Sequence, residues 1–160
     1  MTGQLQRCQS PRLASAAEVY VDSENIYCAI PHGDRNRALE AMLSEYVYKN
    51  YVVIGRPKVI IPRNWKKGPS SSTLDFIRVE CDHPNAIDEE ICRRIYESAR
   101  SRQNGFNPSL VIFSGDGIYL GPIAETRDRW QKVVIVSAKE QLNKCYHTFA
   151  GGITIIHPGQ

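Results

Sequence analysis

The sequence lacks several features that would assign it to a class at once. No apolar run approaches the ~20 residues that a membrane-spanning helix needs. The five cysteines are an odd number and form no CxxC pair, which argues against a disulfide framework and against a structural zinc site. Neither GxGxxG nor a phosphate-binding loop of the GxxxxGK type occurs, so nucleotide binding of those kinds has no support. A reducing, cytoplasmic setting is the natural expectation.

Strong charge is also lacking, since the net charge of +3 is too small to identify a nucleic-acid partner by itself. Of the 160 residues, 42% are hydrophobic and 23% charged, the balance of a globular domain. Residues 1–17 carry basic residues but no acid and no apolar segment. We expect residues 1–17 to form a flexible N-terminal tail and residues 18–160 to form a single domain.

Apolar strand patterns and helical patterns alternate along the rest of the chain. The patterns predict strands at 19–21, 58–62, 73–80, within 109–117, and at 132–138 and 152–156. Helical spacing predicts helices within 34–49, 81–101, 119–130 and 140–150. Alternation with largely apolar strands favours a mostly parallel central sheet that is covered on both faces. The predicted fold class is α/β, a three-layer α/β/α sandwich of Rossmann-like, doubly wound form.

Three acids stand at positions where such a sheet would bring them together. Asp22 and Asp116 each follow an apolar strand, and Asp88 falls in the first turn of a predicted helix. Ligands of open α/β sheets bind outside the carboxyl ends of the strands. Clustered carboxylates repel unless a cation holds them, and hard oxygen ligands select Mg²⁺ or Mn²⁺. A metal there would suit phosphodiester hydrolysis.

Each acid also has a purely structural interpretation. An Asp after a strand often caps a helix or forms a turn, and an Asp in a first helical turn is favoured by the helix dipole. Gly115 and Gly117 are ordinary turn residues that tolerate positive φ. Only the convergence of all three acids on one cleft points to a site.

Three stretches, VYVDSENIY, PNAIDEEIC and LVIFSGDGIYLGPI, together resemble the NYN domains of the PIN-like superfamily of metal-dependent nucleases. The resemblance runs from about Val19 to Ile156. It implies an acidic Mg²⁺ or Mn²⁺ pocket with Asp22, Asp88 and Asp116 as catalytic metal ligands, and an RNA substrate. Asn25 would bond Asp22 or a substrate phosphate, or would only cap the following turn. Ser114 would bond a pocket carboxylate.

One position departs from the family pattern. Many members carry a further acid two residues after the Ser-Gly-Asp acid, and this chain has Ile118 there. We therefore keep two functions open besides the metal-dependent ribonuclease. One is a weakly active or inactive PIN-like domain that binds RNA or a protein partner, and the other is a small-phosphate hydrolase. Assembly into a homo-oligomer also stays open.

A basic, aromatic loop supplies the candidate RNA contacts. Its residues are Arg63, Trp65, Lys66 and Lys67. Cations that face phosphates and a ring that stacks on bases are the usual means of gripping a single strand. The alternative is a solvated loop with Trp65 packed against the body of the domain.

Overall fold

The computed structural model describes residues 15–30, 34–65, 71–103 and 105–159. It confirms the α/β class: a seven-stranded sheet is flanked by helices, and all its described strand pairings are parallel. The strands are β1 (Ser15–Asp22), β2 (Tyr51–Val53), β3 (Lys58–Pro62), β4 (Asp75–Val79), β5 (Ser109–Phe113), β6 (Val133–Val136) and β7 (Thr154–Ile156).

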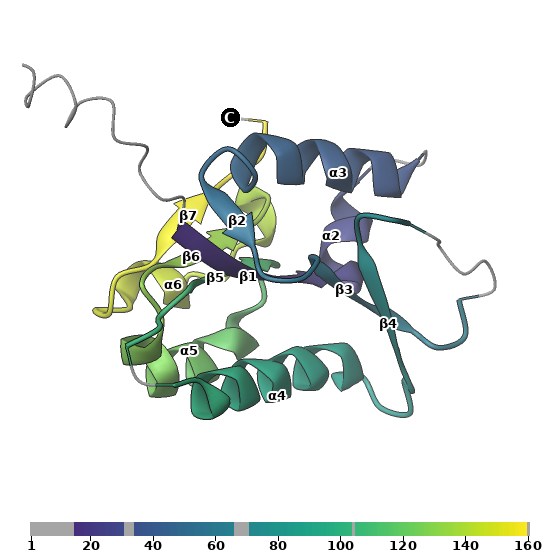
Figure 1. Ribbon diagram of the computed structural model, residues 1–160. Helices are drawn as coiled ribbons and strands as arrows, with labels where there is room; N and C mark the ends of the chain where they lie inside the picture. Colours follow the sequence, from purple (N-terminus) through teal and green to yellow (C-terminus); the bar gives the residue numbers. More distant parts are fainter. Residues whose placement is uncertain (1–14, 31–33, 66–70, 104, 160) are drawn as a thin grey trace, which may run out of the picture.

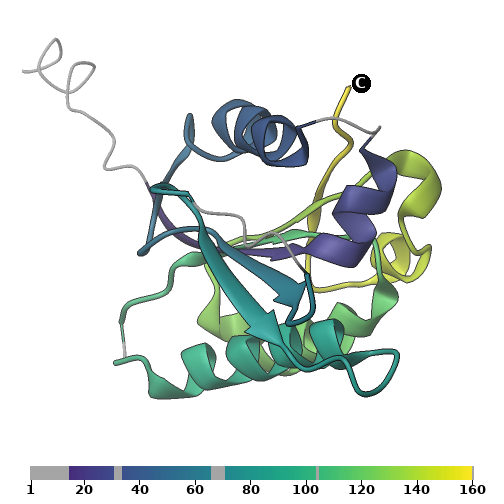
Figure 2. The ribbon, with the colours of Figure 1, turned by 90° about the vertical axis from the view of Figure 1, so that its right-hand side faces the viewer.

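The helices cover both faces of this sheet (Figures 1 and 2). The α-helices are α2 (Ser23–Ala29), α3 (Arg35–Tyr46), α4 (Ala86–Ser101), α5 (Leu120–Thr126) and α6 (Cys145–Thr148). The 3₁₀ turns are η1 (Gly117–Tyr119), η2 (Arg127–Arg129) and η3 (Lys139–Gln141). Figure 1 shows α2 and α3 above the sheet and α4 and α5 below it, which makes the three-layer sandwich.

The alternation of β1 explains how its two faces are covered. Val19 and Val21 point into the core under α2 and α3, whereas Tyr20 belongs to the core under α4 and α5. Asp22 continues the Tyr20 side. The carboxylate that ends β1 therefore lies on the α4 face of the sheet.

The sheet order β4-β3-β1-β5-β6-β7 places the topological switch point beside β1. The chain leaves β1 toward β3 on one side and returns to β5 on the other side. Val21 pairs with Phe113, so the residues that follow β1 and β5 leave the sheet side by side. This is the place where open α/β sheets bind ligands.

Several expected boundaries were wrong. Residues 15–17, expected in the tail, begin β1, and Ala17 is fully buried. The expected helix within 140–150 is instead η3 followed by α6, separated by residues 142–144. The elements α2 and β2 were not predicted, because a seven-residue helix and a three-residue strand are too short to show a clear period. Within the described residues, no helix is long and apolar enough to cross a membrane.

Candidate functional site

The structure brings the three predicted acids to one edge of the sheet. Asp22 ends β1, Asp116 follows β5 after Ser114 and Gly115, and Asp88 lies in the first turn of α4. Because α4 runs antiparallel to the strands, its N-terminus reaches the edge where the strands end. Asp22 is 2% exposed and Asp88 is 9% exposed, so both carboxylates are largely withdrawn from water.

Asp22 is the best-anchored of the three. Its Oδ1 accepts a hydrogen bond from the backbone N–H of Asn25 at 3.2 Å, which caps α2. Its Oδ2 accepts from the hydroxyls of Ser114 at 3.0 Å and Tyr119 at 2.9 Å. Donors from three other segments of the chain thus fix the direction of this carboxylate.

Tyr119 links Asp22 to Asp88. Its hydroxyl lies 2.9 Å from Oδ2 of Asp22 and 3.2 Å from Oδ1 of Asp88, and the ring is fully buried. A phenol has one proton, so it cannot donate fully to both carboxylates. Burial and the charges of the two acids raise the pKa of Tyr119, which keeps the phenol protonated as a donor.

The Asp88 carboxyl is harder to ionise than an ordinary aspartate, because it is buried close to two other acids. Burial, the charge of Asp22, hydrogen bonding with the Asp22 carboxyl and the charge of Asp116 together raise the pKa of Asp88 to about 7. The hydrogen bond from Tyr119 acts in the opposite direction. The same acids act on nearby Cys92, whose pKa is raised to about 12 by burial and then by the charges of Asp88 and Asp116.

Hydrogen bonds fix the Ser-Gly-Asp segment, residues 114–116, in place. Ser114 Oγ accepts from the N–H of Asp116 at 3.2 Å, and the N–H of Gly115 donates to the Asn25 side-chain oxygen at 3.1 Å. Asp116 caps η1 by accepting from the N–H of Ile118 at 3.0 Å. Asn25 and Ser114, expected to contact substrate or a carboxylate, therefore position the loop and Asp22.

Gly115 is required for close approach and not for a positive φ. A Cβ at this position would lie 2.3 Å from the carbonyl oxygen of Gln141 and 2.4 Å from Oγ of Ser137. No positive φ occurs at Gly115 or Gly117, so neither glycine serves that conformation in the turn. The glycine lets the segment after β5 pack tightly against the segment after β6.

The three carboxylates have no cationic partner within the described residues. None of the ion pairs found there involves Asp22, Asp88 or Asp116. His83 lies shortly before α4 and is hydrogen-bonded on both ring nitrogens, Nδ1 to Asp82 at 2.5 Å and Nε2 to Glu89 at 2.6 Å. These two hydrogen bonds raise the pKa of His83, and the bond with Glu89 has the larger effect. The site is a concentration of negative charge that a cation would stabilise.

The three acids nevertheless do not form a ready-made metal-binding site. In the part of the chain that the structure describes, no three His, Cys, Asp or Glu side chains lie together closely enough to hold one ion. Asp22 and Asp88 meet at Tyr119, and Asp116 acts on Asp88 through charge. Oxygen donors of this kind fit a hard divalent cation that keeps several waters.

Ile118 does not extend the acidic edge. In an extended chain, a residue two positions after Asp116 would return to the same side as Asp116. Instead the chain turns into η1, and the half-buried Ile118 packs against the core under α4. The residue that faces the acids is its neighbour Tyr119, which sequence reasoning missed. A buried polar ring in an apolar, helix-like stretch gives no signal of its partners.

The basic, aromatic loop is only partly described. Arg63 Nε pairs with Glu80 at 2.7 Å, and both side chains are exposed. Trp65 is half-buried and stacks on Tyr27, with ring centroids 5.7 Å apart, so one face of the indole is covered. This favours the packing interpretation of Trp65 over a freely available stacking platform. Lys66 and Lys67 lie outside the described residues.

Replacing Tyr119 by phenylalanine is expected to destabilise the fold by about 1–3 kcal/mol, because two buried carboxylates lose their shared donor while the packing is kept. The pKa of Asp88 should rise further, since the Tyr119 bond lowers it. Chemical denaturation at several pH values measures both effects.

Tyr146→Phe is the matched control for this substitution. Tyr146 is similarly buried, and its hydroxyl donates to the backbone carbonyl of Asp116 instead of to a carboxylate. Tyr146→Phe should lower the free energy of unfolding without changing how that free energy depends on pH. Identical pH profiles for the two variants would contradict the bridging role of Tyr119.

Comparisons with known proteins add no identification. No family model matches the chain, and a search of curated proteins found no match. The class that the structure establishes is therefore the fold alone, a parallel α/β/α sandwich with acids at its switch point.

Proposed function

We propose that this chain is a metal-dependent ribonuclease of the NYN type that hydrolyses RNA phosphodiester bonds. The observation that carries the proposal is that Asp22, Asp88 and Asp116 lie at one edge of the sheet, by the switch point, without a cationic partner among the described residues. A structural cap or turn acid gains nothing from two further acids nearby, and Asp88 is penalised by them. A site that binds a cation explains why all three are present.

Asp22, Asp88 and Asp116 would together hold a hydrated Mg²⁺ or Mn²⁺ ion. A bound divalent cation supplies polarisation of a phosphoryl oxygen and lowers the pKa of a water ligand. Ser114 and Tyr119 keep the Asp22 carboxylate oriented, and Asn25 holds the Ser-Gly-Asp segment through Gly115. The raised pKa of Asp88 lets it carry a proton near neutral pH until a cation replaces that proton.

RNA is the proposed substrate, in a reducing compartment such as the cytoplasm. Four cysteines in the described residues are free, which agrees with that setting. Trp65 follows β3 by three residues, and its partner Tyr27 lies on α2, which begins directly after Asp22. Arg63 and Trp65 therefore follow β3 at the edge of the sheet where β1 ends in Asp22, which supports the proposal that the loop of Arg63, Trp65, Lys66 and Lys67 contacts RNA.

A second candidate is a domain that binds RNA or a protein partner without cutting. Two observations favour it: the described residues contain no ready three-donor group, and Ile118 supplies no further acid. This candidate predicts RNA binding that is unaffected by Mn²⁺ and unaccompanied by cleavage.

A cleavage assay tests the proposal. Purified protein is incubated with a fluorescent single-stranded RNA, the DNA of the same sequence, and p-nitrophenyl phosphate, each with Mn²⁺, Mg²⁺ or EDTA. We expect RNA cleavage with Mn²⁺ or Mg²⁺ that EDTA stops. Asp116→Asn should lose it, and Asp75→Asn, an exposed acid on the edge strand β4, should keep it.

The two Asn variants also guard against a contaminating nuclease, because both come through the same purification. Cleavage that persists in Asp116→Asn would contradict the proposal. Hydrolysis of p-nitrophenyl phosphate without RNA cleavage would favour a small-phosphate hydrolase, and binding without either reaction would favour the second candidate.

Replacing Arg63, Lys66 and Lys67 together by alanine is expected to weaken RNA binding and flatten its salt dependence. Each phosphate contact contributes about 0.7 to the log–log slope for a single strand. Arg63 is already paired with Glu80, so the loss should be closer to two contacts than three. Fluorescence anisotropy over a salt series measures the slope, and an unchanged slope would assign this loop to solvent.

A further inference from the structure

A pocket with charged residues at its rim lies at the other end of α4, away from the acids. Its volume is about 390 Å³, and it lies between the last turns of α4 and the α5–η2 segment. Its lining residues are Tyr96, Ala99, Arg100, Arg102, Glu125, Thr126 and Arg129. Asp88 lies in the first turn of the same helix, so a rise of 1.5 Å per residue separates the two sites by roughly 20 Å.

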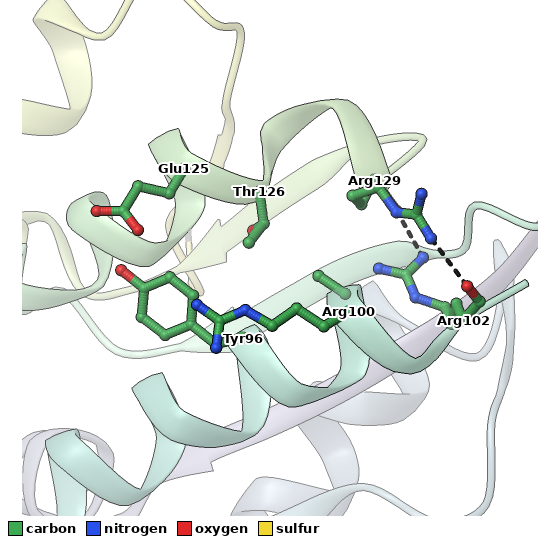
Figure 3. A pocket seen from close by; sticks show the side chains of 7 residues that line it. Tyr96, Arg100, Arg102, Glu125, Thr126 and Arg129 are labelled. Carbon is green, nitrogen blue, oxygen red and sulfur yellow. Dashed lines mark hydrogen bonds between the residues drawn. The ribbon is translucent and has the colours of Figure 1, made fainter. Parts of the chain in front are cut away.

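Two arginines form one end of this pocket (Figure 3). Arg102 Nη1 donates to the carbonyl of Arg129 at 2.5 Å, and Arg129 Nη2 donates to the carbonyl of Arg102 at 3.0 Å. These reciprocal bonds fix the two guanidinium groups beside each other, although their charges repel. Such a pair is an anion-binding arrangement when an anion lies between or against the two charges.

Arg102 is held rigidly in that position. Its Nε donates to the carbonyl of Ser98 at 3.0 Å, and its guanidinium carbon lies 4.2 Å from the ring centroid of Trp130. Its Nη2 is buried and makes no hydrogen bond within the described residues. Burial lowers the pKa of Arg102, the charge of Glu18 acts in the opposite direction, and the charge of Arg129 lowers the pKa again. These contacts hold the Arg102 guanidinium at the wall of the pocket beside Arg129.

The other end of the pocket has a different character. Arg100 extends along the wall and lies over the Tyr96 ring at 5.2 Å, and Glu125 stands beside Tyr96 (Figure 3). Burial raises the pKa of Tyr96, and its interaction with the Glu125 carboxylate raises it further. The pocket thus has three cations, with one acid at the end opposite Arg102 and Arg129.

We propose that this pocket binds a phosphate monoester that is carried on an uncharged body. The phosphate would lie against Arg102 and Arg129 with Arg100 beside it, and the uncharged body would extend toward Tyr96 and Glu125. The carboxylate of Glu125 would repel a second anionic group there and accept hydrogen bonds from hydroxyl or amino groups. A free nucleoside monophosphate and the 5′-phosphate end of an RNA both present this chemistry. The inference does not depend on the acidic site being a nuclease.

Calorimetric titration with adenosine monophosphate tests the pocket in the full chain. Arg129→Gln and Arg100→Gln should each weaken binding by roughly tenfold or more, the usual effect of losing a charge-assisted hydrogen bond. Arg100 is exposed, and its guanidinium packs over the Tyr96 ring, so its removal should not disturb folding. Arg93→Gln is the control, since it removes one positive charge from the exposed side of the same helix.

Glu125→Gln is expected to strengthen anion binding in the pocket, where the arginine substitutions weaken it. It should tighten tripolyphosphate binding more than adenosine monophosphate binding, because only the polyanion is repelled by the carboxylate. A pair of RNAs that differ only in a 5′-phosphate or 5′-hydroxyl separates the two sources of the phosphate. Preference for the phosphorylated RNA over adenosine monophosphate would assign the pocket to an RNA end.

Two results would overturn the inference. One is equal binding by wild type, Arg100→Gln and Arg129→Gln, with folding of each checked by thermal melting. The other is an equal loss in Arg93→Gln, which would show a general effect of charge instead of a pocket.

Discussion

Asp88→Asn is expected to make the metal-free protein more stable at pH 8 while removing its response to Mn²⁺. In the wild type, burial and the charges of Asp22 and Asp116 oppose ionisation of Asp88. Asparagine keeps the shape and removes the charge. Tyr119 can then donate fully to Asp22, and the amide introduced by the substitution can donate to either oxygen. The gain should be on the order of 1–2 kcal/mol after solvent screening.

The loss of the Mn²⁺ response follows from the same carboxylate. An ion that binds only the folded state stabilises it by about 2.7 kcal/mol at one hundred times its dissociation constant. The wild type should therefore show a clear rise in Tm on addition of Mn²⁺. Asp88→Asn should show little or none, because one of the two carboxylates that meet at Tyr119 is gone.

Differential scanning fluorimetry with and without Mn²⁺ measures both effects in one experiment. Asp75→Asn serves as the control, since it removes an exposed acid at the start of β4, whereas the cluster lies where the strands end. A variant that is less stable than the wild type, yet keeps its Mn²⁺ response, would show that Asp88 is a structural acid and not a ligand. The measurement needs no substrate, so it tests the metal site separately from RNA cleavage.

The placement of the acids could be predicted because strand ends are visible in sequence. A run of buried residues such as Leu110 to Phe113 ends where polar residues begin, and parallel strands end at one edge. That reasoning placed Asp22 and Asp116 beside each other, as the pairing of Val21 with Phe113 requires. Helical spacing placed the first turn of α4, and with it Asp88, at the same edge.

The contacts among those acids could not be predicted in the same way. Tyr119 is 97 positions from Asp22 and 31 positions from Asp88, and no local pattern reports such a meeting. Glu18 is another example: it follows strand alternation under α4, where Tyr20 donates to it at 2.9 Å and Ser98 also donates to it. Side-chain partners across layers depend on the direction in which helices cross the sheet, which periodicity does not specify.

Ile118 shows how local backbone geometry bears on a functional inference. A residue two positions beyond a strand-end acid faces the same side only if the chain stays extended. Asp116 caps η1 through the N–H of Ile118, which rotates that residue toward the core. The group that contacts Asp22 and Asp88 is instead the buried hydroxyl of Tyr119.

Between pH 4 and pH 7 the metal-free protein is expected to lose stability as the pH rises. The pKa of Asp88 is about 7 in the folded protein and close to its ordinary value of 3.8 in the unfolded chain. Within this window the folded state binds the extra proton, so the free energy of unfolding falls as the pH rises and levels off above pH 7. Glu24 adds to the trend, because burial and then the charge of Asp22 raise its pKa as well.

His83 contributes in a different window and can be separated from Asp88. Its pKa is raised by its bonds to Glu89 and Asp82, so the stability that it contributes is fully present below 6.5 and is lost as the pH rises through its raised value. Urea denaturation of the wild type, Asp88→Asn and His83→Gln at half-unit steps from pH 4.5 to 8.5 distinguishes them. Asp88→Asn should flatten the profile below pH 7, and His83→Gln should flatten only the part above 6.5.

Saturating Mn²⁺ should remove the lower part of this pH dependence as well. Where a cation replaces the shared proton, the folded state no longer takes up a proton as the pH falls, and the apparent affinity for Mn²⁺ rises with pH up to about 7. A slope below pH 7 that survives both Asp88→Asn and Mn²⁺ would assign the titration to other acids. The carboxyl pair at Tyr119 would then not be the group that exchanges a proton for a metal ion.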